Sequence, residues 1–276
     1  MINMRKILSL IVVIVLSAAT VSAQPVIERE PLLQIASDMS SDLLGMRVSA
    51  GRVFIANAAG NYVRFDLETR EAFKGKAKSN KIIDFDVILG QLVFIDAEGR
   101  LGGRFNSLWP DRAYDGCRVD AADQGLLVSG GDKAFFLGKT ATYAVEIGSL
   151  DFVLPVANGF IWSLSSKKGG NWGADLYDCL GNLMKEVYSF SAEFIPTGIE
   201  VGPAGSEGEL LVSYNENNAR KLALIGNNGR MFWKIDGPEK TGPRDIAFDD
   251  QGNLLVIERK GSELWLNRWV VTFPEG

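Results

Sequence analysis

"GPRDIAFDDQGNLLVIERKGSELW", residues Gly242 to Trp265, contains three apolar runs separated by two turn signals. The first signal is DDQGN and the second is RKGS. Asp, Asn and Gly favour tight turns, and apolar runs on either side of such turns are typical of antiparallel strands. The stretch therefore predicts a small antiparallel sheet with its first strand near Asp245.

The same unit recurs along the chain. A turn glycine followed by an apolar run occurs six times, at Gly51, Gly90, Gly125, Gly159, Gly208 and Gly252. A shorter apolar segment precedes each glycine, and further strands follow it. A period of about 40 residues with four strands per unit is typical of a β-propeller. We predict an all-β fold, a six-bladed propeller of four-stranded antiparallel blades.

The two ends of the repeat pattern are incomplete. Copy six stops at ELWLNRWVVTFPEG and lacks a fourth strand. We expect the apolar segment Pro25–Ala36 to pair outside the last strand of copy six and close the ring, since closure protects sheet edges; the alternative is a disordered N-terminus. In copy two, the fourth strand would have to come from NSLWPDRAYDG, residues 106–116, which reads as a loop.

The last copy resembles an NHL-type repeat, whose pattern is roughly Pro-x-Gly-Ile-Ala-Val-Asp-x-x-Gly-Asn-hydrophobic-x-Val-x-Asp. Copy six matches it well, copy five (IPTGIEVGPAGSEGELLVSY) moderately, and copies one to four keep only the hydrophobicity and the glycine. The resemblance implies a six-bladed propeller that usually binds a partner, although some relatives of this shape are enzymes. Such a motif specifies the fold far better than the function.

The N-terminus reads as a secretory signal peptide. Arg5 and Lys6 precede a 13-residue apolar stretch, and small residues end at Ala23. That stretch is short of the ~20 residues that span a membrane, which disfavours an uncleaved anchor. We predict cleavage after Ala23, a single propeller domain over residues 24–276, no membrane insertion after cleavage, and a periplasmic or secreted protein.

Composition excludes several classes of activity. The chain has no histidine, which removes Ser-His-Asp and Cys-His catalysis and histidine zinc sites. Its net charge of −5 lacks the excess of positive charge that is typical of proteins that bind nucleic acid. We place the two cysteines, Cys117 and Cys179, at opposite ends of neighbouring blades, too far apart for a disulfide, and predict two free thiols.

Aligning the six innermost strands brings three carboxylates to one position. Asp84, Asp151 and Asp245 alternate there with Gly45, Gly116 and Gly198, and the next position, Met46, Phe85, Cys117, Phe152, Ile199 and Ile246, is expected to be buried between blades. The three aspartates could hold Ca²⁺ at the channel mouth, because oxygen ligands suit that ion. Alternatively, each bonds only to local backbone N–H groups in a turn.

One face of the ring is expected to be rich in loops. Second-to-third-strand turns and the connections between blades emerge on the same face, and long examples lie at residues 165–173, 214–220 and 107–114. The candidate ligand-binding residues there are Lys168, Asn171, Trp172, Asn215, Asn217, Trp109 and Tyr114. They are suited to a sugar or peptide, since rigid aromatic and amide side chains dominate recognition surfaces. The alternative is a set of ordinary solvated loops.

Two functions fit these features. The first is a non-catalytic binding or scaffold module for a protein or glycan, which requires no cofactor. The second is a divalent-metal-dependent hydrolase of the lactonase type, with the cation held by Asp84, Asp151 and Asp245. The lack of histidine and of a catalytic constellation favours the binding module, and the ligand is beyond the sequence.

Overall fold

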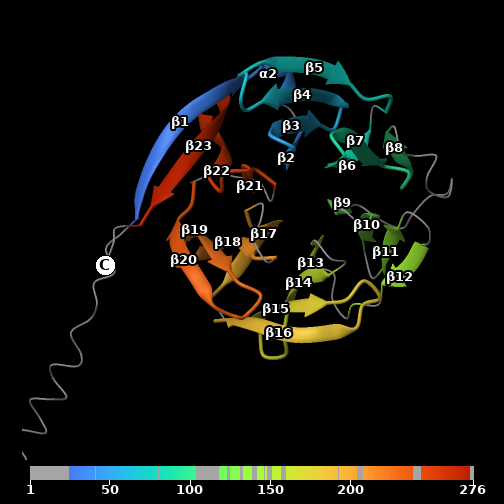
Figure 1. Ribbon diagram of the computed structural model, residues 1–276, viewed down its shortest axis with the longest axis vertical. Coiled ribbons are helices and arrows are strands. Elements are labelled where there is room, and N and C mark those ends of the chain that lie inside the picture. The colour runs from blue at the N-terminus through green and yellow to red at the C-terminus, as the bar shows by residue number, and fades with distance from the viewer. Residues whose placement is uncertain are drawn as a thin grey trace, which may run out of the picture.

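The computed structural model describes residues 25–40, 42–79, 81–103, 118–122, 125–130, 133–138, 142–145, 147, 151–156, 160–191, 193–203, 208–238 and 244–273. These residues form six antiparallel sheets arranged in a ring (Figure 1). The fold is a six-bladed β-propeller, as the repeat predicted. The expected signal peptide lies outside the described residues.

The blades follow one another along the chain, each starting with its innermost strand. Blade one contains β2 (Leu43–Ser49), β3 (Arg52–Asn57), β4 (Asn61–Asp66) and β5 (Ala72–Lys76), and blade two contains β6 (Ile82–Ile88), β7 (Gln91–Asp96) and β8 (Leu101–Gly103). Blade three contains β9 (Arg118–Ala122), β10 (Gly125–Gly130), β11 (Lys133–Gly138) and β12 (Thr142–Val145). The segment in which a fourth strand of blade two was sought, residues 106–116, lies outside the described residues.

The second half of the ring repeats this order. Blade four contains β13 (Phe152–Pro155), β14 (Ile161–Ser166), β15 (Trp172–Tyr177) and β16 (Leu183–Phe190), and blade five contains β17 (Ile195–Val201), β18 (Leu210–Glu216), β19 (Ala219–Ile225) and β20 (Met231–Asp236). Blade six contains β21 (Ile246–Phe248), β22 (Leu254–Lys260) and β23 (Glu263–Thr272), with β1 (Val26–Ile35) as its outermost strand. A short helix, α2 (Ser37–Ser40), leads from β1 into blade one.

The ring is closed by the N-terminal strand. β1 pairs antiparallel with β23 from Val26 opposite Thr272 to Ile35 opposite Leu264 (Figure 1). Ile35 and Leu264 are buried in a cluster that also contains Met46 of blade one. The prediction that the first segment completes the last blade is therefore confirmed.

Aspartates fix several of the tight turns. The Asp249 Oδ1 atom accepts hydrogen bonds from the backbone N–H groups of Gln251 at 3.0 Å and Asn253 at 2.8 Å. Asp96 and Asp178 bind the residues two and four positions ahead in the same way. The short side chain replaces missing backbone partners, which is why Asp-x-x-Gly turns recur through the repeat.

Apolar clusters fill the spaces between blades and show which residues of the innermost strands are buried there. Phe85 packs against blade one, and Ile246 packs against blade five, as expected. In blade four, the equivalent place is taken by Val153, so the predicted Phe152 was one position too early. Cys117, the residue predicted for blade three, lies outside the described residues. Turn lengths differ between blades, so the spacing from the anchor glycine does not fix the register.

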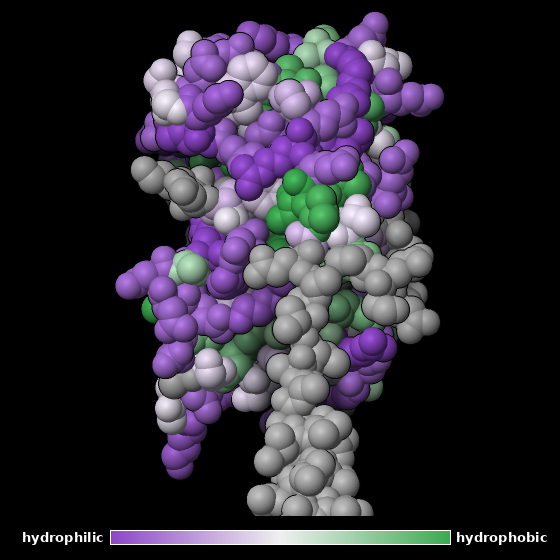
Figure 2. Space-filling view, turned by 90° about the vertical axis from the view of Figure 1, so that its left-hand side faces the viewer, coloured by the Kyte–Doolittle hydropathy of each residue, from purple (hydrophilic) through white to green (hydrophobic). Residues whose placement is uncertain are grey.

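Two further expectations concern chemistry and surface. Cys179, in the turn between β15 and β16, is a free cysteine, as predicted. No helix in the described parts of the chain is long and apolar enough to cross a membrane. Figure 2 shows the side of the ring that carries β1: its visible surface is mainly hydrophilic, with a hydrophobic patch near its middle. Val26 and Phe273, at the free ends of β1 and β23, are exposed.

Candidate functional site

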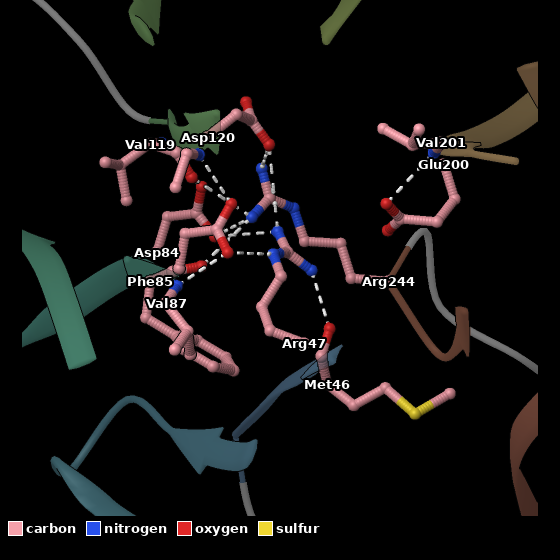
Figure 3. Close-up of polar contacts among 12 residues, drawn as sticks. Met46, Arg47, Asp84, Phe85, Val87, Val119, Asp120, Glu200, Val201 and Arg244 are labelled. Carbon is pink, nitrogen blue, oxygen red and sulfur yellow. Dashed lines mark hydrogen bonds and ion pairs between the residues drawn. The ribbon is translucent and has the colours of Figure 1, made fainter. Parts of the chain in front are cut away.

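The six innermost strands surround the central channel of the ring (Figure 1), and charged side chains from several blades gather there (Figure 3). Arg47 comes from β2, Asp84 and Asp86 from β6, and Asp120 from β9, while Arg244 lies just before β21. At most 12% of any of these side chains is exposed. We call these five residues the channel network.

Two guanidinium groups hold three carboxylates in this network (Figure 3). Arg244 Nη1 is 2.7 Å from Asp84 Oδ1, and Arg244 Nη2 is 2.8 Å from Asp120 Oδ1. Arg47 Nε is 3.5 Å from Asp86 Oδ1, and Arg47 Nη2 is 3.9 Å from both Asp84 and Asp120. The network thus joins blades one and six to blades two and three.

The aspartates also bind the backbone of the next blade. Asp84 Oδ2 accepts the N–H of Val119 at 2.8 Å, and Asp86 Oδ2 accepts the N–H of Ala121 at 2.7 Å. Both carboxylates point from β6 toward β9, because residues two apart in a strand share a face. Hydrogen bonds to charged groups are stronger than neutral ones, so these two bonds fix blade two against blade three.

A glycine makes the position of Arg244 possible. The backbone N–H of Met46 donates to the Arg244 carbonyl at 2.8 Å. Gly45 has φ +109°, and a Cβ atom there would lie 2.5 Å from the same carbonyl oxygen. Only glycine combines this backbone conformation with so close an approach.

Burial changes the acidity of the channel carboxyls. Desolvation raises the pKa of Glu200, on β17, to about 7, against the opposing charge of Arg47. Desolvation and the neighbouring Asp84 raise the pKa of Asp120 well above its usual range. Burial disfavours the charge of Arg47, but the carboxylates of Asp86 and Asp84 outweigh it and hold its pKa above the usual value. Burial is thus the main cause that raises the pKa values of the three network carboxyls, and the charge of Arg47 opposes this shift.

One small cavity lies beside the channel network among the described residues. The cavity between Arg47, Arg118, Asp120, Glu200 and their neighbours has a volume of about 10 Å³. That is close to the room needed for one water molecule. The Asp120 Oδ2 atom is buried and has no hydrogen-bond partner within the described structure. The channel network therefore suits a structural link between blades. Its cavity has room for a water molecule but not for an organic substrate.

The three aspartates of the expected metal ring have different surroundings. Asp84 belongs to the channel network, and Asp151 is exposed, one residue before β13, where its Oδ2 accepts the N–H of Ser166 at 3.3 Å. Asp245 precedes β21, and its charge acts on Arg220. Among the described residues, no three His, Cys, Asp or Glu side chains are placed to hold a metal ion. The structure therefore does not bring Asp84, Asp151 and Asp245 together.

The expected ligand-binding loops lie on the turns of blades four and five. Lys168 and Asn171 are exposed in the turn between β14 and β15. Trp172 is half-buried and packs against Phe152, with ring centroids 6.2 Å apart. The Arg118 guanidinium lies 5.3 Å from the centre of the Phe152 ring on the channel side. Trp172 thus packs against its own blade rather than standing free on the rim.

The remaining candidates are dispersed. Asn217 is exposed at the tip of the turn between β18 and β19, with φ 51°, and Asn215 is half-buried on β18. Trp109 and Tyr114 lie outside the described residues. Of the described candidates, Lys168, Asn171 and Asn217 lie in turns of blades four and five, and Trp172 and Asn215 lie on the strands beside those turns.

A cleft that the sequence did not reveal opens between blades five and six. Its volume is about 760 Å³. Its lining comes from β1, from the residues after β20, and from β22, β23 and the turn between them, and consists of Arg29, Pro31, Gly237, Pro238, Glu258, Arg259, Lys260, Gly261, Trp265 and Asn267. We call this the blade five–six cleft. Because it involves the β22–β23 turn and the connection after β20, it belongs to the loop-rich face.

The interface between blades five and six is apolar in one part and polar in the part that opens as the cleft. In the apolar part, Trp269 and Val256 of blade six pack with Leu211 of blade five in a fully buried cluster. On the same face of blade six, beside Trp269 and Val256, lie Glu258 and Asn267, whose polar side chains line the cleft. The two blades therefore pack together at the apolar residues and are separated by the cleft at the polar ones.

Part of this cleft could have been found from the opening sequence. Arg259, Lys260 and Trp265 all lie in ERKGSELW, where two cations stand beside an aromatic residue. Arg29 and Gly237 join them only through ring closure and the packing of neighbouring blades. A local pattern cannot supply these partners.

Comparisons with known proteins agree with the fold. The structure of a streptogramin B lyase has 14% sequence identity, a TM-score of 0.54 and coverage of 92% of this chain and 100% of that one. The β-propeller domain of Myceliophteria thermophila Cps50 (Swd1) has 11% identity, a TM-score of 0.54 and coverage of 89% and 100%. The WD40 repeats of RRP9 have 11% identity, a TM-score of 0.55 and coverage of 83% and 80%.

These likenesses concern the fold alone, because all three identities are low. No protein-family model matches the chain, and no curated protein matches it. The six-bladed propeller is thus established, while the NHL-type relationship rests on the residue pattern of copies five and six. Propellers of this shape include WD40 domains and a lyase, so the site and not the fold must indicate the function.

Proposed function

We propose that this chain is an exported, non-catalytic binding module that holds a protein or glycan partner on the loop-rich face of its propeller. The observation that carries the proposal is the blade five–six cleft. Its volume of about 760 Å³ is within the range of ligand-binding pockets. Export rests on the N-terminal signal pattern, and the NHL-type resemblance adds the expectation of a partner.

The cleft has the side chains that contribute most to recognition. Trp265 and Arg29 line it, and tryptophan and arginine are enriched among residues that dominate binding energy. Several of its wall residues lie on the paired strands β1, β22 and β23 of blade six, which hold them in place before a partner arrives. Preorganised side chains lose less entropy on binding. The candidates Lys168, Asn171, Trp172, Asn215 and Asn217 belong to blades four and five and do not line the cleft, so the proposed site does not include them.

The lactonase alternative receives less support from the geometry. A metal site at the channel mouth would need Asp84, but both of its carboxylate oxygens are engaged. Oδ1 faces Arg244 at 2.7 Å, and Oδ2 accepts the Val119 N–H. Releasing Asp84 for a cation would leave the buried Arg244 short of a partner, which is costly. Binding therefore remains the function that the site supports best.

Site-specific photo-cross-linking tests the proposal. A photoreactive amino acid is placed at Lys260 in the cleft, at Lys168 on the same face, or at Leu89, which is 78% exposed in a turn on the opposite face. In the cells that export the protein, we expect a discrete adduct from position 260 and none from position 89. An adduct from position 89 alone would overturn the proposed face. An adduct from 168 without one from 260 would move the site to blade four.

A further inference from the structure

The blade five–six cleft has an excess of positive charge. Arg29, Arg259 and Lys260 line it, against the single carboxylate of Glu258. Arg259 and Lys260 are exposed, and neither forms an ion pair with any described residue. The whole chain is acidic, with a net charge of −5. A local cationic site on an acidic protein attracts an anion selectively, because the rest of the surface repels it.

The carboxylate of Glu258 is already used within the blade. Its Oε2 atom accepts hydrogen bonds from Asn267 Nδ2 at 2.7 Å and from Trp269 Nε1 at 3.1 Å. Its Oε1 atom lies 3.6 Å from Arg29 Nη1. Glu258 therefore organises the floor of the cleft, and its single charge cannot balance all three cations.

Arg29 is held in place but keeps donors available. Its guanidinium lies 4.4 Å from the centre of the Trp269 ring, and its side chain is 57% exposed. Stacking on an aromatic ring fixes the plane of the guanidinium without using its N–H groups. A guanidinium presented in this way matches a carboxylate, which accepts two parallel hydrogen bonds.

Apolar surface adjoins these cations. The half-buried Trp265 ring lies on β23, Pro31 lies on β1, and Pro238 faces them from blade five. A ligand that fills the cleft would place an anionic group toward Arg29 and Lys260 and an apolar group toward Trp265. Peptides combine acidic and apolar side chains at adjacent positions, and Arg clusters are a recurring means of recognising acidic motifs.

We propose that the blade five–six cleft binds a segment of a protein partner in which an acidic side chain stands beside an apolar one. This inference rests on the proposed binding function and specifies the partner's chemistry. Two of the three wall residues with apolar surface are prolines, which offer no polar side-chain group to pair with sugar hydroxyls. The peptide is therefore favoured over an acidic glycan.

Selection from a phage-displayed heptapeptide library on the full mature chain tests this proposal. We expect the selected peptides to be enriched in Asp or Glu next to Leu, Ile, Phe or Trp. Binding of a selected peptide should fall about tenfold or more in Lys260→Glu, where like charges would meet. It should be unchanged in Lys168→Glu, which makes the same charge change on an exposed lysine of the same face. It should also weaken as salt rises.

Arg29→Gln provides a second variant within the cleft, and the circular dichroism spectrum and melting temperature of each variant show whether it folds. Selected peptides without acidic enrichment, or with equal affinity for Lys260→Glu and the parent chain, would overturn the inference. So would binding of oligogalacturonate in the cleft with no peptide selected. Cross-linking from position 260 can succeed in each of these cases, so failure of the acidic-peptide inference is distinguishable from failure of the binding function.

Discussion

Arg244 of blade six is joined to Asp120 of blade three by a hydrogen-bonded ion pair of 2.8 Å, although 124 residues separate them in the sequence. Both side chains are buried, with 11% and 3% of their surfaces exposed. The same guanidinium also holds Asp84 of blade two. One residue thus connects three blades across the channel.

Removing this guanidinium should destabilise the whole ring. Arg244→Met leaves the charges of Asp84 and Asp120 buried and poorly compensated, which typically costs about 3–5 kcal/mol of the free energy of unfolding. Arg52→Met is the matched control, because Arg52 pairs with Asp66 at 3.3 Å in an exposed position and should cost at most about 1 kcal/mol. Urea unfolding followed by tryptophan fluorescence measures both. Equal losses of unfolding free energy in the two variants would show that the channel network does not link the blades.

The acidity of Glu200 predicts a pH dependence of stability. Its pKa is raised by burial from 4.5 to about 7 in the folded chain. Between about pH 4.5 and 7 the folded state therefore holds a proton that the unfolded state has lost. The contribution of this group to stability is complete below pH 4.5 and is lost as the pH rises through 7.

Glu200→Gln removes that contribution to the pH dependence. Relative to the parent chain, the variant should gain stability as the pH rises from 5 to 8, because no charge then has to be buried. Urea midpoints at pH 5, 6, 7 and 8 measure the difference, with Glu71→Gln on the exposed end of blade one as the control. A constant difference across this range would contradict the raised pKa.

Ring closure by β1 predicts a contrast within one strand. Ile35 is 4% exposed, and Val26 at the other end is 57% exposed. Ile35→Ala should lower the free energy of unfolding by about 2–5 kcal/mol. Val26→Ala should change it by at most about 0.5 kcal/mol. Chemical denaturation distinguishes the two, and a small effect of Ile35→Ala would mean that β1 adds little to the closed ring.

The contacts of Asp84 predict how the melting temperature responds to calcium. A Ca²⁺ site at 100-fold saturation would stabilise the chain by about 2.7 kcal/mol. Because Asp84 is held by Arg244 and Val119, we expect the melting temperature to be the same in chelator and in millimolar Ca²⁺. A rise that disappears in Asp84→Asn with Asp245→Asn would restore the metal-dependent hydrolase.

The sequence predicted those features that repeat. Turn residues such as Gly252 and the Asp249 turn recur with the blade, so local chemistry sufficed for the six blades and for the closing strand. The register within blade four was not predictable, since Val153 is placed by its packing against blade three. The spacing of the anchor glycines contains no information on that contact.

The candidate sites show the same division. The alignment of the innermost strands placed Asp84 on one of them, which the structure confirms. It could not show that Arg244 enters the channel and pairs with Asp84, because Arg244 lies before its strand rather than within it. Nor could it show the cleft, since Arg29 reaches Trp265's strand only when the ring closes.

The central claim is that the partner occupies the blade five–six cleft. Hydrogen–deuterium exchange of the mature chain, with and without the partner identified by cross-linking, tests it most directly. The account predicts slower amide exchange at residues 29–31 and 258–267, with no change at residues 165–173 or in the innermost strands. Slower exchange confined to residues 165–173, or to the strands that line the channel, would contradict it.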